Sequence, residues 1–186
     1  GACYLDMPDD IISGECDLDD IVQVERVPEP PRTVAPTENI EAALDVLEGA
    51  ERPLVLVGKG MAWAHAETEV REFIDRTQLP FVRSPMGKGV VPDDHPLAAS
   101  AARTLALQQA DVIFLMGARF NWIFHFGLPP RFAPDVKVIQ LDISPEEIGH
   151  NKPSEVALVG DGKAIMGQMN QALEGRQWFY PKDTPW

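Results

Sequence analysis

Five charged side chains stand at the ends of short apolar runs in this chain of 186 residues. Lys59, Lys88 and Arg119 follow the runs PLVLVG, LPFVRS and DVIFLMG, whereas Asp142 and Asp161 stand at the ends of VKVIQLDI and EVALVG. Lysine and arginine bind phosphate groups through charge-assisted hydrogen bonds, and a carboxylate accepts from a ribose hydroxyl. If the ends of the runs converge in space, this set predicts a binding site for a nucleotide-like anion.

Small and uncharged residues surround these charges. Glycine lets backbone N–H groups approach a ligand closely, and an asparagine serves either the backbone of a turn or a ligand amide. The same glycines are also typical of tight turns, and a single lysine or arginine is often just solvated. Only the convergence of the whole set favours a ligand. The candidate set therefore also includes Gly58, Gly60, Met86, Gly87 and Asn121.

Aromatic residues are concentrated in the segment GARFNWIFHFGLPPRF, residues 117–132. We expect Trp122, Phe124 and Phe126 to pack, either within this domain or against another one. Arg119 is the ligand-binding candidate of this segment, and the two prolines at its end restrict the backbone.

Other chemistries find little support in the sequence. The glycines around Lys59 begin a dinucleotide fingerprint, but Trp63 stands where a third small residue is required, and no acidic residue ends the second apolar run. This disfavours NAD(P). The four histidines lack metal-ligand spacing, and no Gly-x-Ser-x-Gly motif is present. We predict no catalytic residue and no metal ligand within this chain.

The elements that must position the candidate residues alternate along the sequence. Apolar runs that are buried on both faces and alternate with helices indicate a parallel sheet covered by helices on both sides. We predict an α/β, doubly wound, Rossmann-like domain with its ligand site beyond the carboxyl ends of the strands. Thr37 is expected to cap the first helix. The expected strands are 53–58, 79–84, 111–117, 136–143 and 155–160, and the expected later helices are 62–77, 99–109 and 162–173, with a short one after 143.

Composition limits the possible partners. The formal net charge of −13 disfavours nucleic acid and anionic membranes. Apolar residues make up 45% of the chain, an ordinary globular balance, and no apolar run approaches the roughly 20 residues that span a bilayer. Cys3 and Cys16 lack metal or redox spacing, which favours a reducing compartment.

The two ends of the sequence differ from its middle. Residues 1–12 read as the last strand of a preceding domain, and residues 13–37 as an acidic, proline-rich linker. Residues 38–175 form the α/β domain, and residues 176–186 read as a linker to a further domain. We therefore expect a fragment of a larger protein, with both ends poorly anchored on the core.

Several motifs together resemble one family. The segments SPMGKGVVPDDHPL, ADVIFLMGARFNWIFHFGLPPRFAPDVKVIQLDI and ALVGD are similar to the central domain of 2-hydroxyacyl-CoA lyases, thiamine diphosphate enzymes related to oxalyl-CoA decarboxylases. The resemblance implies an oligomeric enzyme that cleaves a 2-hydroxyacyl-CoA to formyl-CoA and an aldehyde, with thiamine diphosphate and Mg²⁺ bound by other domains. It also implies a cytoplasmic location in bacteria and a peroxisomal one in eukaryotes.

The resemblance also assigns roles to residues of this chain. It implies that Lys59, Arg119 and Asp142 belong to a pocket that binds ADP, and that Met86, Gly87 and Lys88 face the CoA substrate. Gly160, Asp161 and Gly162 look like the start of a Mg²⁺ motif, but the chain ends before the distant asparagine of that motif. A helix cap at Asp161 is the favoured interpretation.

Three alternatives stay open. The segment HFGLPPRF follows the lyase pattern, with oxalyl-CoA decarboxylase as the second candidate. An acetolactate synthase-like enzyme with FAD in this domain is the third, although such enzymes usually carry acidic residues where Asn121 and Trp122 stand. Gly162 also replaces a bulkier apolar residue that is common in these families, which would loosen an adenine contact. The fourth reading is an inert assembly module.

Overall fold

The computed structural model describes residues 3–184 and 186, which divide into two units, Gly1–Pro31 and Arg32–Trp186. In the first unit every described residue is exposed. It contains the helix α1 (Asp9–Ile12) and the 3-10 helix η1 (Leu18–Asp20), which Asp17 caps by accepting a hydrogen bond from Asp19 N. Without a buried face, this unit has no hydrophobic core of its own.

The second unit is built on a five-stranded sheet in which every pair of neighbouring strands is parallel. The strand order is β2-β1-β3-β4-β5, so the chain crosses from one side of β1 to the other between β2 and β3. This confirms the predicted parallel α/β fold and places a topological switch point between β1 and β3. The strands are β1 (Pro53–Val57), β2 (Phe81–Arg83), β3 (Val112–Met116), β4 (Lys137–Asp142) and β5 (Val156–Val159).

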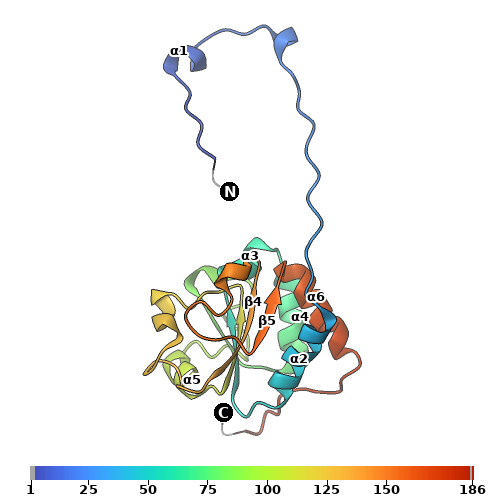
Figure 1. Ribbon diagram of the computed structural model, residues 1–186, viewed down its shortest axis with the longest axis vertical. Helices are drawn as coiled ribbons and strands as arrows, with labels where there is room; N and C mark the ends of the chain where they lie inside the picture. Colours follow the sequence, from blue (N-terminus) through green and yellow to red (C-terminus); the bar gives the residue numbers. More distant parts are fainter. Residues whose placement is uncertain (1–2, 185) are drawn as a thin grey trace. The chain divides into compact units, whose positions relative to one another are not determined.

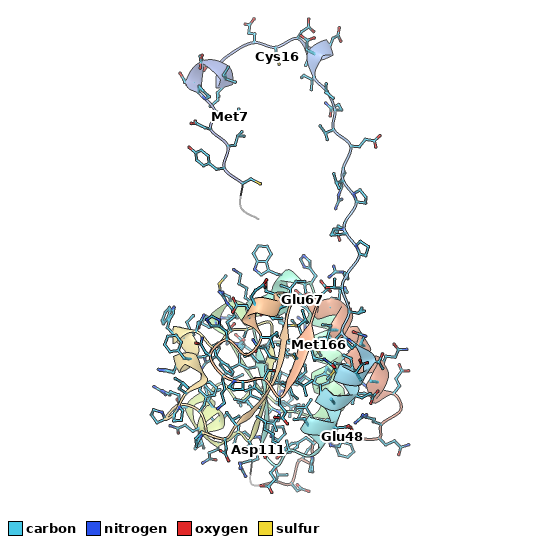
Figure 2. All side chains as sticks on the ribbon, in the orientation of Figure 1. Met7, Cys16, Glu48, Glu67, Asp111 and Met166 are labelled. Carbon is cyan, nitrogen blue, oxygen red and sulfur yellow. The ribbon has the colours of Figure 1, made fainter. Side chains whose placement is uncertain are left out.

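Helices cover both faces of the sheet (Figure 1). On one face lie α2 (Thr37–Glu48), α4 (Glu67–Thr77) and α6 (Gly162–Leu173), and on the other lies α5 (Arg103–Gln109). Successive strand residues alternate between the two cores, because Val55 packs in the first and Leu54 in the second. Phe73 of α4 meets Phe114 of β3 edge to face at 5.8 Å. Met166 of α6, labelled in Figure 2, is wholly buried in the first core.

Each predicted strand is shorter in the structure by one to three residues, and three helix boundaries differ for identifiable reasons. The expected helix 62–77 is two helices, α3 (Lys59–Trp63) and α4, because His65 adopts a left-handed conformation with φ 53°. The expected helix 99–109 begins only at Arg103, because the backbone of Ala99 bonds to Phe81 of β2. Thr37 does not cap α2, since the carbonyl of Pro36 already accepts the first helical hydrogen bonds.

Short 3-10 helices follow three of the strands. The 3-10 helices η2 (Pro85–Gly87), η3 (Trp122–Gly127) and η4 (Pro145–Glu147) follow β2, β3 and β4, and η4 is the short helix that was expected there. Across the described residues, the search for a helix both long and apolar enough to cross a membrane found none.

The C-terminal residues pack on the amino ends of the strands, contrary to the poor anchoring that we expected. Tyr180 is buried, its N–H donates to Thr77 O at 2.7 Å, and its hydroxyl donates to Glu51 O at 2.7 Å. Trp186 Nε1 donates to Pro53 O at 2.9 Å. Tyr180 and Trp186 thus have partners within this chain, whereas Phe179 is exposed.

One arginine fastens the beginning of this segment to α2. The guanidinium of Arg176 pairs with Glu48 at 2.8 Å, with Asp45 at 2.7 Å and with Glu41. The hydrogen bonds that the guanidinium donates to Glu48, and then to Glu41 and Asp45, raise the pKa of Arg176 above its ordinary value. A bond network of this kind holds the backbone far better than a single exposed ion pair.

Limited digestion with trypsin should therefore cut after Arg26 well before it cuts after Arg176. The side chain of Arg26 is 87% exposed in a segment without a core, whereas that of Arg176 is 20% exposed and held by three carboxylates. Mass spectrometry of timed samples measures both cuts. Cleavage after Arg176 as early as cleavage after Arg26 would show that the C-terminal residues are not docked.

Candidate functional site

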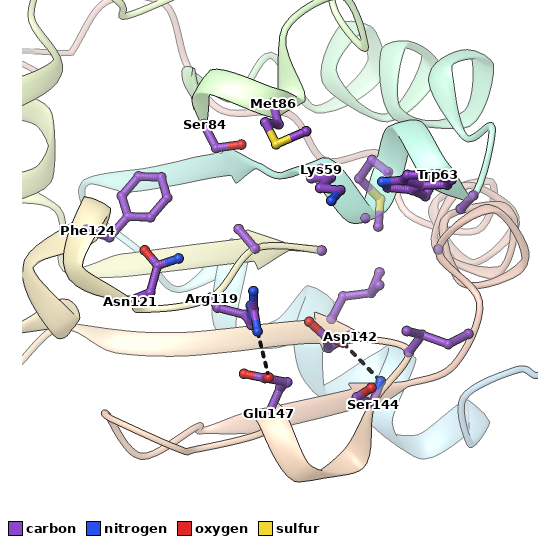
Figure 3. Close-up of a pocket in the computed structure, with 18 of the residues that line it drawn as sticks. Lys59, Trp63, Ser84, Met86, Arg119, Asn121, Phe124, Asp142, Ser144 and Glu147 are labelled. Atoms are coloured by element: carbon purple, nitrogen blue, oxygen red, sulfur yellow. Dashed lines mark hydrogen bonds and ion pairs between the residues drawn. The ribbon is translucent and has the colours of Figure 1, made fainter. Parts of the chain in front are cut away.

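A cavity of about 650 Å³ lies at the carboxyl edge of the sheet, where the turns after the strands meet (Figure 3). Its position matches the expected ligand site beside the switch point between β1 and β3. The fold brings most of the predicted residues together there. Those that line the cavity are Lys59, Gly60, Met86, Arg119, Asn121, Asp142 and Asp161.

Two glycine turns touch each other at the base of this cavity. A Cβ on Gly58 would lie 2.2 Å from the carbonyl oxygen of Gly117, and one on Gly60 would lie 2.8 Å from Gly117 Cα. Gly60 N donates to Gly117 O at 2.8 Å. The backbone of the second turn thus fills the space a side chain would need, so the packing of the turns itself demands glycine at these positions.

The two predicted cations project from these turns. Lys59, the first residue of α3, lies with its ammonium 5.4 Å from the centre of the Trp63 ring. Arg119 follows β3 and pairs with Glu147 through Nη1 and Oε1 at 3.1 Å, while its side chain stays 60% exposed. Both cations line the same cavity, and anions are the ligands that such side chains bind.

Asp142 ends β4 and lines the cavity on the side of Arg119 (Figure 3). Its Oδ1 accepts from Ser144 N at 3.0 Å. Burial raises the pKa of Asp142 above its ordinary value, and the nearby charge of Glu147 adds to this, against the opposing effects of the Ser144 hydrogen bond and of Arg119. A partly desolvated carboxylate at a strand end is well placed to accept from a ligand hydroxyl.

Asp161 has structural partners. It accepts from Ala164 N at 3.0 Å, which is the helix cap expected from the sequence. Arg32 Nη1 donates to both carboxylate oxygens, at 2.9 and 2.8 Å. Although burial alone would raise the pKa of Asp161, the hydrogen bonds from Arg32 and from Ala164 N–H lower it below its ordinary value. Asp161 thus remains ionised while it closes the turn before α6.

The segment 117–132 combines ligand-facing and structural residues. Asn121 caps η3 by accepting from Ile123 N at 3.0 Å, and it also lines the cavity. Phe124 packs as expected, with the guanidinium of Arg103 4.9 Å from its ring centre. By contrast, Trp122 is 74% exposed, and Phe126, at 46% exposed, is only partly covered by the described residues.

The predicted CoA-facing residues occupy different environments. Met86 lines the cavity and is exposed. Gly87 is buried, and a Cβ there would lie 2.4 Å from Val57 O, so no side chain fits. Its N–H donates to Ser84 Oγ at 3.0 Å. Lys88 pairs with Asp93 at 3.4 Å and is not among the residues that line the cavity.

Sequence reasoning missed Glu147 and Trp63 as cavity residues. Glu147 lies 28 positions from Arg119, in a charged segment that reads as solvated, and only the folded loop after β4 reveals the pair. Trp63, which disfavours a dinucleotide fingerprint in the sequence, lines the cavity next to Lys59. In the described part of the chain, no group of three or more His, Cys, Asp or Glu side chains is placed to hold a metal ion.

Comparison with known proteins identifies the family. Residues 40–169 match the family model described as the thiamine pyrophosphate enzyme, central domain. The chain is 47% identical to 2-hydroxyacyl-CoA lyase 1 of Homo sapiens over 186 residues, 100% of this chain and 32% of that protein. It is 42% identical to 2-hydroxyacyl-CoA lyase of Oryza sativa subsp. japonica over 195 residues, 100% of this chain and 34% of that protein.

A relative with a different name is nearly as similar. Oxalyl-CoA decarboxylase of Escherichia coli (strain K12) is 40% identical over 185 residues, 97% of this chain and 32% of that protein. The chain thus spans about a third of the length of these curated relatives. The family model covers most of the chain and the whole parallel sheet, and it confirms the resemblance inferred from the motifs. The chain belongs to the family of thiamine pyrophosphate enzyme central domains.

Proposed function

We propose that this chain is the central domain of a thiamine diphosphate-dependent lyase that cleaves a 2-hydroxyacyl-CoA. The observation that carries the proposal is the similarity along the whole chain: 47% identity to a relative named 2-hydroxyacyl-CoA lyase, against 40% to one named oxalyl-CoA decarboxylase. Decarboxylation of oxalyl-CoA is the second candidate. Both names contain a CoA thioester, so a CoA thioester is the proposed substrate class under either reading.

Within that enzyme, we propose that the cavity at the carboxyl edge binds a nucleoside diphosphate such as ADP. Its volume falls in the range of small-molecule sites, about 300–1,000 Å³. Arg119 can offer two parallel N–H groups to one phosphate, whereas Lys59 supplies a point charge on the opposite side. Asp142 uses Oδ1 for Ser144 N, and a carboxylate has further lone pairs with which to accept from a ribose hydroxyl.

The residues of this chain do not fit thiamine diphosphate and Mg²⁺. Asp161, the acidic residue of the Gly-Asp-Gly motif, already accepts from Arg32 and from Ala164 N. We therefore propose that other parts of the enzyme hold both groups, that the enzyme is a homo-oligomer, and that Met86, Gly87 and Lys88 face the CoA substrate. A cytoplasmic location in a bacterium or a peroxisomal one in a eukaryote belongs to the same proposal, as does the division of the chain at residues 12, 37 and 175.

Substituting Arg119 tests the nucleotide site. Loss of one charged hydrogen-bond partner costs about 1.5–3 kcal/mol, so Arg119→Ala should weaken ADP binding roughly ten- to a hundredfold. Isothermal titration calorimetry at low salt measures it. Lys137→Ala is the matched control, because it removes one positive charge from an exposed side chain at the opposite end of β4, and it should leave the affinity nearly unchanged.

Other outcomes of the same titration select among the alternatives. Equal ADP affinity for the parent and Arg119→Ala would remove Arg119 from the site. Tight binding of FAD, with a yellow protein, would favour the acetolactate synthase-like reading. No binding of ADP, CoA or FAD would favour the assembly module.

Calorimetry with thiamine diphosphate and Mg²⁺ tests where that cofactor binds. Because Asp161 is engaged in the helix cap and with Arg32, we expect the 186-residue chain to show no binding tighter than about millimolar, a free energy of about −4.1 kcal/mol. Tighter binding that is lost in Asp161→Ala, with ADP binding retained, would contradict this expectation.

The raised pKa of Asp142 predicts a pH-dependent gain in stability for Asp142→Asn. Because the folded state favours the protonated form, the contribution of Asp142 to stability is present at low pH and is lost as the pH rises through its folded-state pKa. At pH 7 the amide should raise the Tm by about 1–3 °C, and this gain should fade as the pH falls toward 4.

Calorimetric melting across this pH range measures the effect, with Asp135→Asn, at an exposed position, as the control. A lower Tm for Asp142→Asn at pH 7 would mean that the ionised carboxylate stabilises the fold. The site would then be structural at this position.

A further inference from the structure

The ion pair between Arg119 and Glu147 separates two neighbouring cavities. The main cavity lies on one side of the pair, and a second cavity of about 390 Å³ lies on the other. Arg119, Asn121 and Glu147 line both. The pair thus lies at the boundary that the two cavities share, and a ligand that bonds to Arg119 in either cavity lies close to Glu147 (Figure 3).

The side chain of Gln140, on β4, holds the backbone around Glu147 in place. Gln140 of β4 is buried, and its side-chain nitrogen donates to Glu147 O at 2.7 Å. The oxygen of the same amide accepts from Gly149 N at 2.9 Å, and Glu147 N donates to Ser144 O at 3.1 Å. These bonds fix the loop on both sides of Glu147, so the carboxylate is presented to Arg119 by an ordered backbone. An exposed pair between two mobile side chains would lack this support.

Carboxylates outnumber cations in the main cavity, so the pairing of Arg119 with Glu147 affects how the cavity binds an anion. The main cavity is lined by two cations, Lys59 and Arg119, and by three carboxylates, Asp142, Glu147 and Asp161. Arg32 neutralises Asp161, whereas among the described residues Arg119 is the cation that pairs with Glu147. A phosphate that approaches Arg119 therefore meets a guanidinium whose charge already has a partner, within a chain of net charge −13.

We propose that Glu147 is a specificity-determining residue that competes with the ligand phosphate for Arg119. The inference rests on the proposed nucleotide site, and it adds how that site would select diphosphates over other ligands. A diphosphate carries more charge and more acceptor oxygens than a carboxylate, so it can take over the guanidinium in a bidentate contact. Anions with a single carboxylate gain nothing by the exchange, and a nucleoside without phosphate does not take part in it.

The test is a calorimetric titration of ADP and of adenosine into the parent, Glu147→Gln and Glu146→Gln. Glutamine keeps the shape of the side chain, and the backbone carbonyl that binds Gln140 is unchanged. Glu147→Gln should bind ADP roughly three- to tenfold more tightly, because Arg119 is released. Glu146→Gln removes the same charge from the neighbouring, exposed position and should change the affinity less than about twofold. Adenosine should bind all three proteins alike.

Repeating the substitution in an Arg119→Ala background separates competition from plain repulsion. Competition requires Arg119, so Glu147→Gln should tighten ADP binding much less there than in the parent. Equal tightening in both backgrounds would overturn the proposal, because it would make Glu147 a general repulsive charge. Weaker ADP binding by Glu147→Gln would also overturn it, since Glu147 would then be a ligand contact.

The failure of this inference is distinct from failure of the nucleotide site. If the parent binds ADP and Glu147→Gln binds it equally well, only the competition is wrong. If neither protein binds ADP at millimolar concentration, the nucleotide site itself is wrong and the competition falls with it. Melting curves identify any misfolded variant, for which Glu147→Ala, with the same expected tightening, is the replacement.

Discussion

The backbone contact between the turns after β1 and β3 is the constraint on which the site depends. Gly58 N donates to Met116 O and Gly60 N to Gly117 O, both at 2.8 Å, and a Cβ on Gly58 would lie 2.2 Å from Gly117 O. The two turns are thus joined like a continuation of the sheet. Because Lys59 and Arg119 leave from these turns, backbone packing fixes the positions from which both side chains project toward the cavity.

The amino end of the sheet is closed by packing and hydrogen bonds, whereas the carboxyl end is open to a ligand. At the amino end, the backbone N–H groups of Glu51 and Arg52 bond to the carboxylate of Asp111, labelled in Figure 2, and Tyr180 and Trp186 close the surface. At the carboxyl end, cations and partly buried carboxylates line an open cavity. Among the carboxylates of the cavity, burial raises the pKa of Asp142, so its ionised form costs stability, as expected where a residue is retained for binding.

The features that local sequence patterns control, namely the strands and the residues at their ends, were predictable from the sequence. The run VIFLM had to be a buried strand, and parallel strands bring Lys59, Arg119 and Asp142 to one edge, as observed. Features set by tertiary contact were not predictable. His65 adopts a left-handed conformation that divides a predicted helix, and no neighbouring glycine or proline in the sequence indicates this break. The Arg119–Glu147 pair and the docking of Tyr180 depend on loops whose paths follow from packing between distant segments.

A crystal structure of the chain grown with ADP would show whether this edge of the sheet binds a nucleoside diphosphate through Arg119. We expect phosphate oxygens within about 3.2 Å of the Arg119 guanidinium, with the ribose toward Asp142 and the carboxylate of Glu147 no longer paired with Arg119. ADP bound on another surface, or bound here with its phosphates remote from Arg119 and the ion pair intact, would contradict it.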